Sequence, residues 1–171
     1  MSNYQHTATD YFQIDDLLTD EHKIIRASVR DWVNRAVKPI IEAYAEKAKF
    51  PLHLIKELGQ LGAFGPYLPE KYGCAGLDHT AYGLIMQELE RGDSGIRSAA
   101  SVQSSLVMYP VFAFGSEEQR LKYLPLLAKG ELIGCFGLTE PNHGSNPGGM
   151  ETRLRDAGDH FVLNGAKMWI T

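Results

Sequence analysis

Apolar residues recur at helical spacing along the first 131 residues of the chain, and the pattern then changes to alternation with frequent turn residues. The longest helical repeat covers residues 20–50 and follows Thr19, a residue suited to cap a helix, with acidic residues in the first turn. Pro39 is expected to kink or divide this helix. The face expected to be buried consists of Ile25, Val29, Trp32, Val33, Val37, Ile40 and Ile41.

Two shorter helices are predicted next. The first begins at Pro51 and ends at Gly62, which agrees with the preference for proline at helix starts and glycine at helix ends. Residues 62–78 contain several glycines and prolines without a period, so they are predicted to be a loop. Asp78 then caps a helix over residues 79–92.

Two more helices complete this part of the chain. Ser94 is expected to cap a long helix over residues 95–114, interrupted near Pro110. Ser116 and Gln119 form a capping-box pattern for a helix that ends at Gly130. The pattern therefore predicts about five helices.

The remaining residues are predicted to form strands, which are LIGCFGL, METRLRD, HFVLNG and AKMWIT. Asn164 and Gly165 lie between the last two and give a strong signal for a two-residue hairpin turn. So few strands make only part of a sheet. We therefore expect an α-helical domain over residues 1–131, and the incomplete start of a β domain over residues 132–171 of a longer protein.

Composition narrows the class of protein. The chain is 44% hydrophobic and 22% charged with a net charge of −4, values ordinary for a globular protein without the basic face of a nucleic-acid binder. No apolar run reaches the ~20 residues needed to span a bilayer, and the N-terminus lacks the features of a signal or transit peptide. Two distant cysteines favour a reducing compartment, and the histidines show no metal-ligand spacing.

The loop GLTEPNHGSNPGG is the first candidate for chemistry. Its glycines, Gly137, Gly144, Gly148 and Gly149, are expected to let the backbone approach a ligand and to adopt positive φ where needed. Backbone N–H groups here could form a nest for an anion, with Ser145 adding a hydroxyl. An ordinary surface loop is the alternative, and composition alone slightly favours it. The spacing matches neither a P-loop nor GxGxxG.

A second candidate lies in DSGIRSAASVQSSL. Arg97 and Ser101 are four residues apart and share a helix face, with Ser104 one turn further and Ser98 beside them. An arginine near a helix N-terminus opposes the dipole but can clamp a carboxylate in a bidentate manner. From the residues alone, a carboxylate clamp and an internal salt bridge, for instance to Asp93 or Glu90, are equally good interpretations of Arg97.

The third candidate is KMWIT. Trp169 on a strand could cover one face of a flat aromatic ligand, with Thr171 reaching an edge atom of that ligand. A tryptophan that simply fills the core is the more common situation.

These segments carry a resemblance. CFGLTEPNHGSNP resembles the flavin loop of the acyl-CoA dehydrogenase family, usually L-T-E-P-x-x-G-S-D, and KMWIT resembles its second flavin strand. EEQRLKYLPLLAKGE is similar to the helix that precedes the first flavin strand, so the resemblance covers essentially the whole chain. It implies the family's α-helical N-terminal domain and the start of its β-barrel-like middle domain, truncated before the C-terminal helical domain. Within the family, SGIRSAASVQSSLVMYPVFAFGSEEQR is most similar to the glutaryl-CoA dehydrogenases.

The resemblance implies FAD-dependent oxidation of glutaryl-CoA to glutaconyl-CoA, with decarboxylation to crotonyl-CoA and CO₂, as in lysine and tryptophan degradation. Electrons would pass to an electron-transfer flavoprotein, and the full-length protein would be a homotetramer in the bacterial cytoplasm or the mitochondrial matrix. The catalytic base would be a glutamate of the absent C-terminal part, so no catalytic residue is assigned and this portion alone is expected to be inactive. An acyl-CoA dehydrogenase for another short acid, or a non-catalytic acyl-CoA-binding module, remain as alternatives.

The resemblance also implies the site residues. It places the substrate carboxylate at Arg97 with Ser98 and Ser101, and it places the FAD pyrophosphate and CoA beside Ser145. Thr171 would bond the flavin nitrogen that receives hydride. Two departures are Asn146 in place of the usual aspartate and His143 in place of a small residue. The flavin contacts that it implies are Phe136, Gly137, Leu138, Thr139, Glu140, Pro141, Asn142, His143, Gly144, Ser145, Trp169, Ile170 and Thr171.

Overall fold

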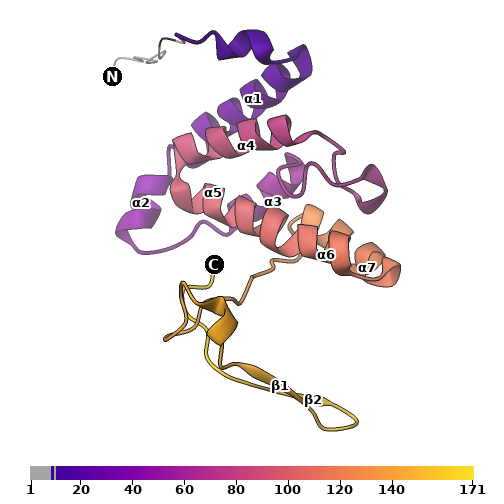
Figure 1. Ribbon diagram of the computed structural model, residues 1–171. Coiled ribbons are helices and arrows are strands. Elements are labelled where there is room, and N and C mark those ends of the chain that lie inside the picture. Colours follow the sequence, from indigo (N-terminus) through magenta and orange to yellow (C-terminus); the bar gives the residue numbers. More distant parts are fainter. Residues whose placement is uncertain (1–8, 10) are drawn as a thin grey trace.

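The computed structural model describes residue 9 and residues 11–171. Within them, seven α-helices pack together, and the chain then runs into a loop-rich segment with one hairpin (Figure 1). The helices are α1 (Asp20–Trp32), α2 (Ile41–Glu46), α3 (His53–Gln60), α4 (His79–Gly92), α5 (Ser94–Ser101), α6 (Tyr109–Phe114) and α7 (Glu117–Ala128). Short 3₁₀ turns cover Ile14–Leu17, Glu70–Tyr72 and Pro147–Gly149, and π-helical segments cover Val33–Val37 and Val102–Met108.

The π-helical segments join α-helices into longer rods. Val33–Val37 prolongs α1 up to the turn at Pro39, which separates it from α2 as the sequence predicts. Val102–Met108 joins α5 to α6, so the interruption begins well before Pro110, which lies inside α6. Counted in this way the described residues form six helical units, one more than predicted because α2 is separate, and the predicted helical N-terminal fold is confirmed.

Side-chain caps fix most of the helix starts. Thr19 caps α1, because its Oγ1 accepts a hydrogen bond from the amide of His22 at 3.2 Å. Asp78 caps α4 in the same way, and Ser116 and Gln119 form the predicted capping box at α7.

The cap of α5 differs from the prediction. Asp93 is the cap, since its Oδ1 accepts from the amide of Ile96 at 2.8 Å. The prediction that Ser94 caps this helix is therefore wrong by one residue. The carboxylate takes the free amide, and the Ser94 hydroxyl donates instead to Glu90 at 2.6 Å.

One hydrophobic core lies among the helices. α4 contacts both α1 and α5, and the apolar faces of all three turn inward. Buried core residues come from positions 29 to 128 and include Val29, Trp32, Leu54, Leu58, Phe64, Tyr72, Ile85, Leu89, Ile96, Met108 and Leu124.

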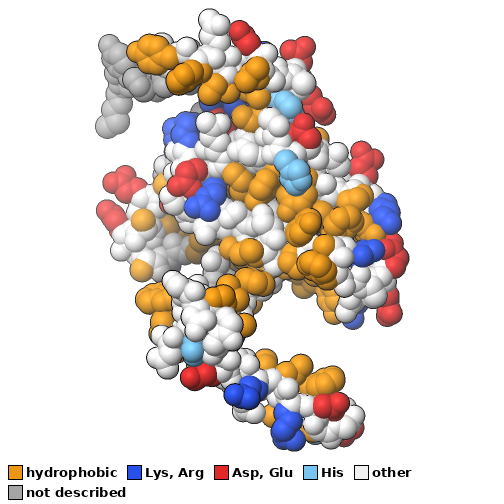
Figure 2. All heavy atoms as spheres, viewed as in Figure 1, with side chains coloured by type: hydrophobic (Ala, Val, Ile, Leu, Met, Phe, Trp, Pro, Cys, Tyr) orange, Lys and Arg blue, Asp and Glu red, His pale blue; other side chains and the backbone are white. Residues whose placement is uncertain are grey.

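Beyond α7 the chain leaves this core. Strands β1 (Arg153–Asp156) and β2 (Phe161–Asn164) form an antiparallel hairpin that extends away from the helices (Figure 1). Leu154 lies opposite Leu163, and both are exposed. Figure 2 shows hydrophobic side chains along one edge of this arm and basic ones along the other.

Two predicted strands are absent from the described structure. Residues 132–138 are not a strand, because their backbone bonds to the side chain of Gln103 rather than to a neighbouring strand. Residues 166–171 are not a strand either, and Trp169 has a φ of 59° that breaks an extended chain.

The predicted hairpin at Asn164 and Gly165 is also wrong. Gly165 has a φ of 152°, far from the left-handed value that a type I′ turn requires. A Cβ added to Gly165 would clash with Oγ1 of Thr152, so there is no room for a side chain. The turn of the observed hairpin lies instead between β1 and β2, at residues 157–160.

Candidate functional site

Arg97 projects from the first turn of α5 and is only partly covered, with 36% of its side chain exposed. Its Nε donates to Oε2 of Glu90 at 2.6 Å, and its Nη1 donates to Oγ of Ser101 at 3.3 Å. Arg97 and Ser94 together hold the pKa of Glu90 below its ordinary value. The salt bridge considered from the sequence is thus present, with Glu90 as the partner, and Ser101 shares the face of Arg97 as predicted.

Ser104 does not join this face. It is fully buried, its Oγ accepts from the amide of Gly65 at 3.0 Å, and it contacts the carbonyl of Ala63. The prediction that placed Ser104 one turn beyond Ser101 assumed an α-helix, but a π-helical turn holds an extra residue and rotates the residues after it. Ser98 lies beside Arg97 and is half-buried, and its carbonyl accepts from the Ser101 hydroxyl.

The loop over residues 137–149 is compact at its centre. Glu140 and His143 bond each other's backbone in both directions, at 3.1 and 3.2 Å, which closes a tight turn around Pro141 and Asn142. None of the four loop glycines has a positive φ, so that expectation is wrong. Of these four glycines, only Gly149 has no room for a side chain, because a Cβ there would clash with His143 and Asn146.

Glu140 is the one buried residue after position 131, with 4% of its surface exposed. Its carboxylate accepts from the amides of Glu151 at 2.6 Å and Thr152 at 3.0 Å, and from Nζ of Lys167 at 2.9 Å. The pKa of Glu140 is lowered to about 2, first by the neighbouring Thr152 side chain, then by the Glu151 amide, with Lys167 adding to the effect. This side chain therefore organises the loop from within.

Two bonds tie the loop to the last residues of the chain. Lys167 Nζ also donates to the carbonyl of Leu138 at 2.9 Å, and the amide of Met168 donates to the carbonyl of Thr139 at 2.9 Å. Thr139 consequently lies next to the residue that precedes Trp169. The structure brings together the two segments that the sequence analysis singled out separately.

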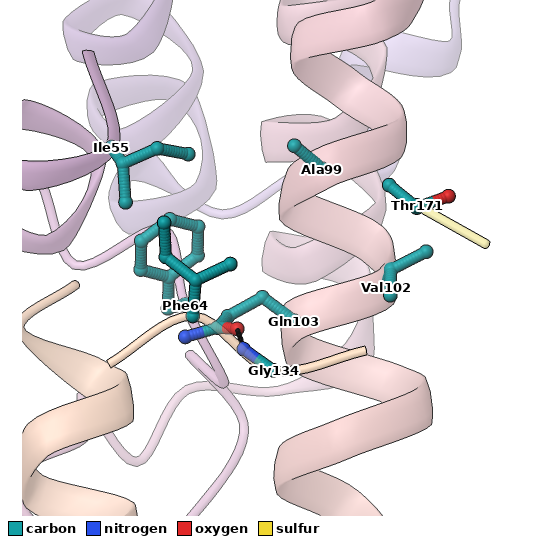
Figure 3. Close-up of a pocket in the computed structure, with 8 residues that line it drawn as sticks. Ile55, Phe64, Ala99, Val102, Gln103, Gly134 and Thr171 are labelled. Atoms are coloured by element: carbon teal, nitrogen blue, oxygen red, sulfur yellow. Dashed lines mark hydrogen bonds between the residues drawn. The ribbon is translucent and has the colours of Figure 1, made fainter. Parts of the chain in front are cut away.

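Trp169 points into open space and is 86% exposed, so the alternative of a tryptophan filling the core is wrong. Thr171 lies close to the turn of Ala99 and Val102 on the helix that carries Arg97 (Figure 3). The cavity beside it holds about 40 Å³, enough for a water molecule and far too small for a tricyclic ring. A planar ligand would have to approach from the open side of these residues.

A larger hollow lies between the start of the loop and strand β2 with the residues after it. It has a volume of about 460 Å³ and is lined by Gly137, Met150, Thr152, Leu163, Gly165 and Lys167. This volume is in the range of cofactor sites, but the hollow is open to solvent.

The remaining predicted contact residues lie on the surface. Phe136, Gly137, Leu138, Pro141, Asn142, Gly144, Ser145 and Ile170 are exposed. A Cβ built on Gly144 would meet no atom within 4 Å, so this part of the loop faces free space. His143 is half-buried, and its Nδ1 has no hydrogen-bond partner in the described chain.

Gln103 is a residue that the sequence analysis missed. Its Nε2 donates to the carbonyls of Leu127 at 3.0 Å and Leu132 at 2.8 Å, and its Oε1 accepts from the amide of Gly134 at 2.9 Å (Figure 3). This buried amide therefore joins the helices to the chain that leads into the loop. The sequence did contain a signal for this role, because Gln103 is a long amide side chain in a helix whose other residues are mostly small or apolar.

The described residues contain no group of three or more side chains that could hold a metal ion. None of their helices is long and apolar enough to cross a membrane. Neither finding identifies a ligand.

Comparisons with known proteins identify the family. Residues 19–131 match the family model of the acyl-CoA dehydrogenase N-terminal domain, and residues 135–171 match that of the acyl-CoA dehydrogenase middle domain. The probable acyl-CoA dehydrogenase YngJ of Bacillus subtilis is 40% identical over 90% of this chain, and the match covers 40% of that relative.

Solved structures similar to this chain belong to the same family. A glutaryl-CoA dehydrogenase from Mycobacterium smegmatis in complex with FADH2 is 52% identical with a TM-score of 0.90, over 93% of this chain and 41% of that one. Butyryl-CoA dehydrogenase from Megasphaera elsdenii is 34% identical with a TM-score of 0.84, over 90% and 41%. The chain thus spans about 40% of the length of the relatives it matches. Fold, loop and family models lead to one conclusion: this chain belongs to the acyl-CoA dehydrogenase family.

Proposed function

We propose that the protein to which this chain belongs oxidises glutaryl-CoA with FAD as its cofactor. The single observation that carries the choice of substrate is Arg97, a partly exposed guanidinium beside two serine hydroxyls on the helix that faces Thr171. Identity supports it: the chain is 52% identical to a glutaryl-CoA dehydrogenase but 34% identical to a butyryl-CoA dehydrogenase.

The described residues have the chemistry to hold a flavin. Trp169 offers an uncovered ring face beside Thr139, and the free space over Gly144 and the Ser145 hydroxyl would suit a pyrophosphate. A buried imidazole nitrogen without a partner, Nδ1 of His143, lies in the same loop. Bound FAD would supply the acceptor for the hydride that leaves the substrate.

At the other end, Arg97 would select the substrate. Nε of Arg97 donates to Glu90 and Nη1 donates to Ser101, whereas Nη2 has no hydrogen bond among the described residues. A distal carboxylate could bond this free edge, whereas a plain acyl chain would cover the charged pair without bonding to it. The ion pair with Glu90 also holds the guanidinium in one orientation.

The proposed reaction removes a proton from the α-carbon and a hydride from the β-carbon, which leaves a double bond between them. The distal carboxylate would then leave as CO₂, and the electron pair of the broken C–C bond would take up a proton at carbon to give crotonyl-CoA. The two electrons carried by the hydride would pass to an electron-transfer flavoprotein. The chain's own residues would bind and orient the substrate. We place the base in a C-terminal part of the protein, after a helical domain over residues 1–131 and a β domain that begins at residue 132, and we infer a homotetramer.

The test is Arg97→Gln in the full-length gene product. Glutaryl-CoA turnover, as kcat/KM, should fall by about 100-fold or more, since a charged bidentate contact is lost. Butyryl-CoA turnover should change by no more than a few-fold. Arg35→Gln is a matched control, because Arg35 is an exposed arginine in another helical segment. Equal losses on both substrates would contradict the proposal.

A second candidate is oxidation of an unbranched short-chain acyl-CoA. The Glu90 ion pair favours it, because Arg97 already has a partner without any substrate. A substrate panel that gives a higher kcat/KM for butyryl-CoA than for glutaryl-CoA would select this candidate. A purified protein that lacks flavin yet binds CoA esters would point instead to a binding module.

A further inference from the structure

Three stretches of the C-terminal segment meet at one ammonium group. Nζ of Lys167 lies 2.9 Å from the carbonyl of Leu138, 2.9 Å from Oε1 of Glu140 and 3.3 Å from Sδ of Met150. Lysine has three N–H donors, so these contacts use its full capacity. The side chain is mostly covered, with Glu140 beneath it.

The two oxygens that Lys167 holds belong to the residues on either side of Thr139. The carbonyl of Thr139 itself accepts from the amide of Met168, the residue after Lys167. Three consecutive residues, 138–140, are therefore fixed against residues 167 and 168 by one side chain and one backbone bond. No strand ladder holds these two segments, because neither is part of the described sheet.

An ion pair is not needed here for stability alone. A buried carboxylate and ammonium must lose water, and an apolar pair of similar volume is often as stable. Charged, hydrogen-bonded partners instead fix one alignment of the two segments, because each oxygen must meet its own donor. In the described part of the segment after residue 131, the one buried residue is Glu140, so apolar packing cannot fix that register instead.

We propose that Lys167 is a positioning residue that sets the register between residues 138–140 and 167–169, and with it the spacing of Thr139 from Trp169 and Thr171. The inference rests on the proposed function, because these residues are the proposed contacts of the flavin ring. Glu140 acts with Lys167 as the buried anchor of the register. Neither side chain needs to touch the cofactor.

The test uses the full-length gene product with three substitutions. Lys167→Met removes the charge and keeps an extended chain, Lys167→Arg keeps the charge, and Glu140→Gln keeps the volume of the anchor. Lys56→Met, at an exposed position on α3, is the matched control. FAD dissociation constants and the visible absorption spectrum of the bound flavin are measured, together with amide hydrogen exchange of residues 139 and 168 in flavin-free protein.

The dissociation constant should rise by about tenfold or more in Lys167→Met, with an altered flavin spectrum and faster exchange at Met168. Lys167→Arg should return both within about threefold of the parent, and Glu140→Gln should give a smaller change in the same direction. The control should match the parent.

The inference is overturned if Lys167→Met binds FAD with the parent's constant and spectrum, or if Lys167→Arg loses as much as Lys167→Met. Should Lys167→Met fail to fold, the spectrum and exchange of Glu140→Gln decide between the same two results. A parent protein that binds no FAD would refute the proposed function itself. A flavin-bearing parent with unaffected variants would refute only the role of Lys167.

Discussion

The helical part and the C-terminal segment are stabilised in different ways. Residues 29 to 128 supply every buried apolar side chain of the described core, whereas residues 132–171 bury a single side chain, and it is charged. The first region is held by apolar packing. The second is held by a few polar side chains, namely Gln103 at its start and Glu140 with Lys167 at its centre.

The difference shows which residues decide structure in each region. A packed core distributes stability over many side chains, so any one contact is one of many. A segment without a core depends on bonds with defined donors and acceptors, and the loss of one partner leaves another unsatisfied. Site geometry in this chain therefore depends on a small number of polar groups.

The largest expected effect on stability comes from a leucine-to-alanine substitution, made once in the helical core and once in the hairpin. Leu58→Ala removes a side chain that is 0% exposed and should lower the free energy of unfolding by about 2–5 kcal/mol. Leu154→Ala, at a residue 63% exposed on β1, should change it by less than about 0.5 kcal/mol. Chemical denaturation of both variants checks this. Similar losses would mean that the hairpin packs against a core of its own.

The next effect concerns the junction between the regions. Gln103→Ala leaves the carbonyl of Leu132 and the amide of Gly134 without the Gln103 bonds, and it removes one of the two bonds to the carbonyl of Leu127. It should destabilise the fold by about 1–3 kcal/mol. Amide exchange at Gly134 should speed up while exchange in α1 stays unchanged. Gln87→Ala, at an exposed position on α4, serves as the control. Unchanged exchange at Gly134 would show that the junction does not depend on this side chain.

The smallest effect is confined to acidic pH. The pKa of Glu140 is lowered to about 2 from an ordinary 4.5, so its ionised form stabilises the folded segment. That contribution is complete above about pH 4.5 and is lost as the pH falls towards 2. The ionisable groups around it are Lys167, Glu151 in the segment after the loop, and His143 on the turn.

Amide chemical shifts of Glu151 and Thr152 should report this titration, with a midpoint near pH 2. The shifts should not show this transition in Glu140→Gln. A midpoint near 4.5 would mean that the carboxylate is exposed to water and that the loop is looser than described.

The helices could be predicted from the sequence because local signals and the burial pattern agree there. Thr19, Asp78 and Ser116 cap the helices that they precede, and the apolar faces of those helices enter the core. The error at Ser94 is small, because an aspartate stands directly before it and competes for the same amide.

The C-terminal segment could not be predicted equally well, because its strands need neighbours that the local pattern does not specify. Residues 132–138 alternate like a strand, yet Gln103 takes their backbone bonds. Asn164 and Gly165 resemble a turn, but Gly165 lies against Thr152 with a φ of 152°, which is not the conformation of a two-residue hairpin turn. The motifs identified the family, and only the fold showed Gln103 and Lys167.

The wide helical turn at Val102–Met108 contains one residue more than a regular α-helix would need in the rod that carries Arg97. Removal of one amino acid from this stretch would therefore let an ordinary α-helix run through, with α6 still packed on α7. Removal of one amino acid from the regular helix α5 would instead turn every later residue of the rod by about 100° about its axis. The wide turn is thus the part of this rod where loss of a single residue should disturb the fold least.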